Sequence, residues 1–188
     1  MIVLCAIYIN ADAQKLTYKI FLNKDMIGTL VATRDIQTDH VNYVMQSSMT
    51  VHKIINVDVE YSLKSSFSHG KLIQSTAYQK INKKIQTNTL TQWDGAQYNI
   101  KTKDDNLVIK NKVINNNMCS IYYYEPIGIS QVYSDAFGKF LPVKPVAAHR
   151  YEVVLPDGKK NYYNYSSGIC YLVETDQLFS KIIFRLTR

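Results

Sequence analysis

Hydrophobic and polar residues alternate along most of the chain. In the longest such stretch, Ile55 to Phe67, apolar residues occupy nearly every second position and polar or charged residues lie between them. A period of two is typical of a β-strand with one buried face and one face in water. The same alternation recurs over residues 16–22. We therefore expect long strands that place their apolar side chains on one face of a sheet.

Short polar sequences separate the alternating stretches. They contain Asn, Asp, Ser or Gly, as at residues 23–25, 68–70 and 156–158. Turns this short join antiparallel neighbours, because parallel strands need a crossover of about a dozen residues. The chain is therefore predicted to be all-β, an antiparallel meander of about 10–12 strands. A sheet of that width twists and curls, so we expect a barrel or half-barrel.

One segment interrupts the regular pattern. Three asparagines at 115–117 precede an aromatic stretch, and irregular sequence follows to about Pro145. We expect one short helix or turn near 118–124, capped by Asn117 and ended by Pro126. The alternative is an extended aromatic segment. Because no linker and no change of composition divides the chain, residues 14–188 are predicted to form a single barrel-like domain.

The first residues have the features of a cleavable leader. Residues 2–9 are apolar and uncharged, and a small-x-small cleavage site follows at residues 11–13. We expect a signal peptide over residues 1–13, truncated at its N-terminus because no basic region precedes the apolar stretch. Cleavage between Ala13 and Gln14 would make the protein exported, either periplasmic or extracellular. The alternative is that these residues form a first β-strand.

Cleavage would leave two cysteines, Cys119 and Cys170. In an oxidising compartment the two can form one disulfide, and a free buried pair is the alternative. Their spacing matches neither a zinc site nor a redox C-x-x-C motif. No metal site is assigned to them.

The chain is basic, with 22 Lys and Arg against 15 Asp and Glu and a net charge of +7. Such an excess of positive charge is typical of proteins that bind an anionic polymer or an anionic membrane surface. The basic residues are scattered through turns, however, which is typical of an ordinary soluble surface. Export argues against nucleic acid as a partner. No apolar run approaches the roughly 20 residues of a transmembrane helix.

Catalytic motifs are missing from the sequence. The four histidines form no H-E-x-x-H pair, the glycines form no phosphate-binding loop, and no G-x-S-x-G elbow occurs. We therefore assign no catalytic residue and no cofactor, and we expect a protein that is not an enzyme. An unrecognised hydrolase is the minor alternative.

Several stretches carry a resemblance to a known family. They are LTYKIFLN with DMIGTL, VDVEYSLKSSF before a His-Gly turn, and SQVYSDAFGKFLPV with HRYEVVLPDGKKNYYNYSSG. From about Lys15 to Arg188 the chain resembles short exported bacterial proteins whose domain has no assigned function. That family is similar to the curved-sheet half-barrel proteins of the Gram-negative envelope, some of which carry lipid or lipoprotein chains. The resemblance implies a lipoprotein-carrier-like fold and supplies no catalytic residues.

Together these observations predict an exported, non-catalytic envelope protein. Its concave sheet face would bind a lipid or a hydrophobic segment of another protein. The alternative is a structural protein with a fully packed core, whose basic face docks on anionic polymer or the membrane surface. The side chains expected to line the concave face are Tyr18, Ile20, Leu22, Val57, Val59, Tyr61, Leu63 and Phe67.

Overall fold

The computed structural model describes residues 13–52, 56–177 and 180–187. The predicted leader, residues 1–13, lies almost wholly outside the described residues. Within them, no helix is long and apolar enough to cross a membrane. The described strands are β1 (Gln14–Leu22), β2 (Asp25–Gln37), β3 (His40–His52), β4 (Asn56–Ser68), β5 (Lys71–Ile81), β6 (Lys84–Trp93), β7 (Gln97–Lys101), β8 (Asn106–Lys110), β9 (Gln131–Ser134), β10 (Lys139–Ala147), β11 (Arg150–Val154), β12 (Lys160–Ser166), β13 (Ile169–Gln177) and β14 (Ser180–Leu186).

All fourteen strands belong to one antiparallel sheet. Its order is β8-β7-β6-β5-β4-β3-β2-β1-β14-β13-β12-β11-β10-β9, so strands that follow one another in sequence pair at every step except β8 to β9, and β1 also pairs with β14. The predicted antiparallel meander is therefore confirmed. The ladder is open at one place, between β8 and β9.

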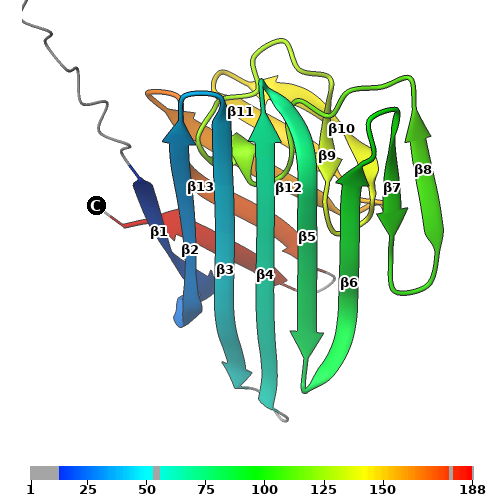
Figure 1. The fold of residues 1–188 in the computed structure, drawn as a ribbon. Coiled ribbons are helices and arrows are strands. Elements are labelled where there is room, and N and C mark those ends of the chain that lie inside the picture. The colour runs from blue at the N-terminus through cyan, green and yellow to red at the C-terminus, as the bar shows by residue number, and fades with distance from the viewer. Residues whose placement is uncertain (1–12, 53–55, 178–179, 188) are drawn as a thin grey trace, which may run out of the picture.

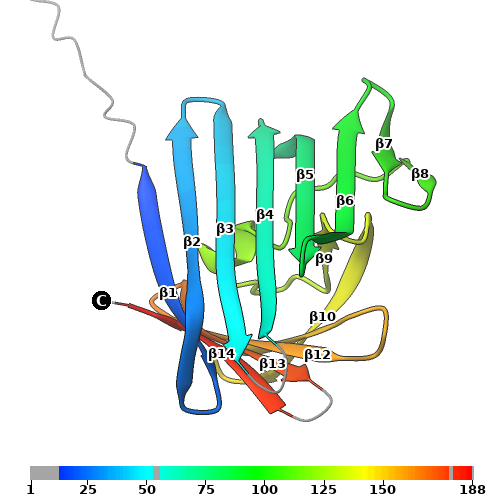
Figure 2. The same ribbon diagram turned by 90° about the horizontal axis from the view of Figure 1, so that it is seen from below.

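The sheet folds back over itself. Strands β1 to β6 run side by side in one layer, and β11 to β13 cross behind them (Figures 1 and 2). Side chains of β6 link the first layer to β9 and to the β9–β10 turn. The hydroxyls of Thr91 and Tyr133 lie 2.7 Å apart, and Thr89 Oγ1 donates to the carbonyl of Ala136 at 2.9 Å. The result is the expected curved, barrel-like sheet, which is not closed by a strand pair.

The predicted number of strands was too low, because β9 and β10 fall in the segment expected to be irregular. Strand β9 has four residues, too few to show an alternating pattern. Strand β10 contains Pro142 and Pro145, which lack the amide hydrogen that a ladder uses. Its first half pairs with β9 and its second half with β11, so each half has a different partner.

The segment between β8 and β9 enters the interior in its middle part, where residues 117 and 119–123 are buried. The amide of Leu72 donates to the carbonyl of Ile114 at 2.8 Å, which fixes the start of this segment to β5. A single 3₁₀ turn follows, η1 (Ser120–Tyr122), and the Asn117 side chain accepts the Ser120 amide at 3.0 Å. The expected short helix is thus present near 118–124, but only as one 3₁₀ turn.

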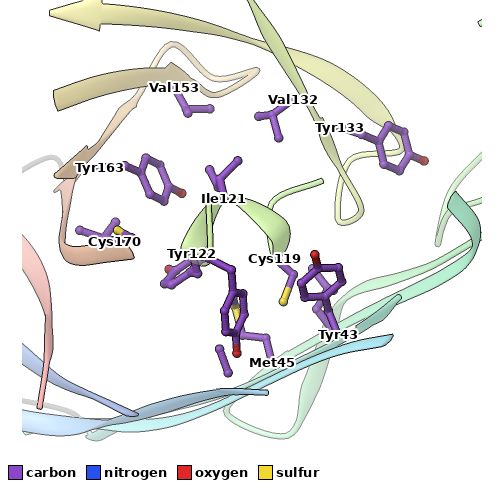
Figure 3. Close-up of a cluster of buried hydrophobic side chains, with 14 of the residues drawn as sticks. Tyr43, Met45, Cys119, Ile121, Tyr122, Val132, Tyr133, Val153, Tyr163 and Cys170 are labelled. Carbon is purple, nitrogen blue, oxygen red and sulfur yellow. The ribbon is translucent and has the colours of Figure 1, made fainter. Parts of the chain in front are cut away.

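Side chains of η1 join the two layers. The ring of Tyr122 packs edge-on against Tyr18 of β1, with centroids 5.3 Å apart, and against Tyr163 of β12 at 6.0 Å. Figure 3 shows Ile121 and Tyr122 between the two layers. The core therefore depends on a segment that is not part of the sheet.

Of the two alternatives for the cysteines, the structure has the free buried pair. Cys119 lies beside η1 and Cys170 in β13, and neither thiol forms a disulfide. Burial raises the pKa of both thiols above the usual range. They act here as small apolar core residues.

Gly28 marks a close approach of β2 to β3. A β-carbon at this position would lie 2.6 Å from the Cα of Met49, inside the contact distance of carbon atoms. We expect Gly28→Ala to lower the free energy of unfolding by about 1–3 kcal/mol, because the two strands must separate to make room. Urea denaturation measures this loss. Thr29→Ala, at the exposed neighbouring position, should change stability little, and equal effects would contradict the explanation.

Candidate ligand-binding cavity

The residues predicted to line the concave face have two different environments. Tyr18, Ile20, Leu22, Leu63 and Phe67 are buried and pack in the core. The remaining three, all in β4, are half-buried. The β4 strand therefore passes from solid core near its C-terminal end to a more open region near its N-terminal end.

An apolar cavity lies between the two layers at this open region. Its volume is about 320 Å³, and Val59 and Tyr61 are among its lining residues. Leu30 and the three methionines Met45, Met49 and Met118 also line it. The other lining residues, from both layers and from the β9–β10 turn, are Ser47, Gln79, Thr87, Tyr122, Ser134, Ala136, Phe137, Leu141, Leu155, Asn161, Tyr163, Val173, Thr175 and Phe184.

The lining is apolar with a few uncharged polar groups. Among the described residues, none that lines the cavity carries a formal charge. Its polar side chains are hydroxyls and amides, and the Ser47 hydroxyl is buried without a hydrogen-bond partner. A charged group placed inside this cavity would lose its hydration and gain no counter-ion. The cavity therefore suits an apolar chain and excludes an ionised head group.

A buried carboxylate, Asp135, lies in the chain between the cavity residues Ser134 and Ala136. Its side chain accepts a hydrogen bond from Asn117 Nδ2 at 3.1 Å, and the same amide donates to Ser65 Oγ at 2.9 Å. Burial raises the pKa of Asp135 to about 6, and the hydrogen bond from Asn117 offsets part of that effect. Nothing in the sequence indicates that Asp135 is buried, because an aspartate shortly before a glycine is typical of an exposed turn.

Metal-ligating side chains do not gather in the described part of the chain. There, no group of three or more His, Cys, Asp or Glu residues is placed to hold a metal ion. His149, for example, contacts a single carboxylate, that of Glu125 at 3.0 Å. The cavity is thus the principal candidate site.

Comparison with known proteins agrees with this architecture. The chain belongs to the class of β-barrel-like proteins. It is similar to the solved structure of a β-barrel-like protein of the domain of unknown function DUF1849 from Brucella abortus. That similarity has a TM-score of 0.55 and 11% identity, and it covers 94% of this chain and 96% of the other.

Within that class, the chain belongs to the DUF6134 family, a domain of unknown function whose model matches residues 18–187. No curated protein matches it. The expected membership of a family without an assigned function is therefore confirmed. The resemblance to lipoprotein carriers stays a prediction.

Proposed function

We propose that this protein is a non-catalytic binding protein that holds a single apolar chain in the cavity between its two layers. The observation that carries the proposal is the cavity itself, which residues of both layers and of the interior segment line. Binding pockets for small molecules are typically apolar with a few polar groups, and they measure about 300–1,000 Å³. This cavity falls at the small end of that range.

The volume limits the ligand. Water occupies about 30 Å³ per molecule in the liquid, so 320 Å³ holds about ten groups of that size. One acyl chain of medium length fits this space, whereas a lipid with two long chains does not. The predicted alternative of a hydrophobic protein segment is limited in the same way to one or two large side chains.

The lining can adapt to such a chain. Met45, Met49 and Met118 lie at three places around the cavity, and methionine is the most flexible of the large apolar side chains. A bound chain would remove apolar surface from water at about 25 cal/mol per Å², before the cost of ordering the ligand. Affinity would therefore come from burial of the chain.

The proposal of a non-catalytic role rests on the chemistry of the lining. The described lining residues include no His, Cys, Asp, Glu or Lys, so the serine and threonine hydroxyls of the cavity have no general base among the lining side chains. Export to the envelope is proposed from the leader alone. Binding an apolar chain is compatible with that location, where lipids are the abundant source of such chains.

Filling the cavity tests the proposal. We expect Val59→Trp to weaken binding of the neutral dye N-phenylnaphthylamine by about tenfold, equivalent to about 1.4 kcal/mol, because the indole occupies the space of the dye. The matched control is Val31→Trp, at a half-buried valine on the outer face of the same layer. Dye fluorescence gives the affinities, and circular dichroism checks that both variants fold.

Two results would overturn the proposal. One is equal dye binding by the two variants, which would place the dye elsewhere. The other is a wild-type protein that binds neither dye nor decanol but binds anionic vesicles in a salt-dependent way. That outcome would favour the structural alternative, in which the basic face docks on a membrane or polymer.

A further inference from the structure

The cavity reaches the hairpin turns of both layers. In the first layer, Gln79 and Thr87 line it from facing positions on β5 and β6, close to the turn at Asn82 and Lys83. In the second layer, Leu155 and Asn161 line it on either side of the β11–β12 turn. All four of these lining residues are half-buried. Both turns therefore lie next to the half-buried lining residues at this end of the cavity, and we take this end as its mouth.

Five lysines lie in or beside these two turns, and three of them are paired with acidic side chains. Lys80 contacts Glu60 at 3.5 Å, and Lys159 and Lys160 also have acidic partners, Asp157 at 2.7 Å and Glu152 at 3.0 Å. Over the described ranges, Lys83 and Lys84 are exposed and have no ion pair. Lys83 in the turn and Lys84 at the start of β6 therefore carry two positive charges that no ion pair of the described residues compensates.

The nearby acid Asp58 does not neutralise this turn. Its backbone bonds to Asn82, but its carboxylate accepts a hydrogen bond from the Thr50 hydroxyl at 2.8 Å. The side chain of Asp58 belongs to the polar, outward-facing set of β4 and is exposed. Its charge is therefore directed away from the cavity side of the sheet.

Lys83 occupies a position where glycine would be expected. Asn82 and Lys83 both have positive φ, 45° and 66°, which defines a two-residue hairpin turn of the kind that prefers glycine second. Two other turns of this chain with paired positive φ follow the preference, His69-Gly70 and Ser167-Gly168. A lysine held in a left-handed conformation is strained, and such strain concentrates at functional sites.

We propose that the occupant of the cavity is an anionic amphiphile with one chain. Its chain would lie among the apolar lining residues, and its charged head would stay at the mouth beside Lys83 and Lys84. The inference rests on the proposed function and adds the class of ligand to it. A medium-chain carboxylate is the simplest molecule with this chemistry.

Decanoate and decanol, which have chains of the same length, test the proposal by displacement of N-phenylnaphthylamine from the full chain. We expect decanoate to bind more tightly at low salt. The difference should vanish between about 0.01 M and about 1 M salt, where the screening length falls from about 30 Å to about 3 Å. Burial of the chain is insensitive to this change, so decanol affinity should stay constant.

The double variant Lys83→Gly with Lys84→Gln separates the charge from the fold. We expect decanoate affinity to fall on the order of fivefold, because two exposed charge interactions are lost, and decanol affinity to stay unchanged. Because glycine suits the turn, the urea midpoint should stay constant or rise. The matched control is Lys19→Gln with Lys64→Gln, which removes the same net charge from exposed positions elsewhere on the sheet.

The outcomes distinguish this inference from the proposed function. Equal affinity for decanoate and decanol, or equal effects of the two double variants, would overturn the anionic head while leaving the apolar cavity as a binding site. Failure of both ligands to displace the dye would overturn both proposals. A fivefold loss confined to decanoate and to the turn variant would support the anionic amphiphile.

Discussion

Leu63→Asp is expected to unfold the protein, whereas Val59→Asp, four residues earlier on the same strand, leaves it folded. Leu63 has no exposed surface and lies between Met45 and Ala77 in the ladder. Its replacement loses about 2–5 kcal/mol of packing and also buries a carboxylate without a partner. The sum approaches the 5–15 kcal/mol by which a typical domain is stable.

Val59 differs because its side chain borders the cavity and is half-buried. Because this position is half-buried at the border of the cavity and not in its interior, an aspartate there keeps part of its hydration, so we expect a small loss of stability and a large loss of affinity for apolar ligands. Far-UV circular dichroism and urea titration measure the first effect, and dye displacement measures the second. If Val59→Asp unfolded the protein as readily as Leu63→Asp, this region would be packed core and the binding proposal would fail.

The strands and their inward faces could be predicted from local pattern because each depends on neighbours along the chain. Alternation in β1 and β4 specifies which side chains share a face, and the burial of Tyr18, Ile20 and Leu63 agrees with it. Strands β9 and β10 carried no such signal. Their pairing depends on partners supplied by the curved sheet, and the prolines of β10 conceal its extended conformation.

The cavity could not be predicted in the same way. Whether the apolar face of a strand is packed or borders a cavity depends on the side chains that lie opposite it. In this protein those side chains come largely from the interior segment around η1. Tyr122 fills the space between β1 and β12, while Val59 and Tyr61 have an incomplete covering. The contact of Tyr18 with Tyr122 joins residues about a hundred positions apart, so no periodic pattern within a single strand can predict it.

Asp135→Asn is expected to stabilise the protein at neutral pH. The carboxyl has a pKa of about 6 in the folded protein and an ordinary value of 3.8. Because the folded state binds the proton more tightly, the carboxyl destabilises the fold increasingly as the pH rises from 3.8 to about 6, and the penalty is complete above that range. A shift of this size corresponds to about 3 kcal/mol at pH 7, at 1.36 kcal/mol for each pKa unit. The titratable groups that interact with it are Tyr61, Tyr133 and Cys119, and burial keeps all three neutral at that pH.

Asparagine preserves the local hydrogen bonding while removing the charge. Its carbonyl oxygen can accept the bond from Asn117, and its amide can donate to the hydroxyl of Ser75, which lies beside the carboxylate. We expect no gain in the free energy of unfolding well below pH 3.8, a small gain near pH 4 that increases up to about pH 6, and a plateau of about 3 kcal/mol above that range. Urea denaturation of both proteins across this range gives the difference directly.

Asp94→Asn provides a control of opposite sign. Asp94 is exposed in the β6–β7 turn, where hydrogen bonds from the amides of Ala96 and Gln97 hold its pKa below the usual value. Its ionised form therefore favours the folded state, and the variant should be less stable than wild type at neutral pH, with the difference vanishing as the pH falls through the lowered pKa. If Asp135→Asn gave the same stability difference at pH 4 and pH 7, its effect would come from packing, and the buried charge would not be the destabilising group.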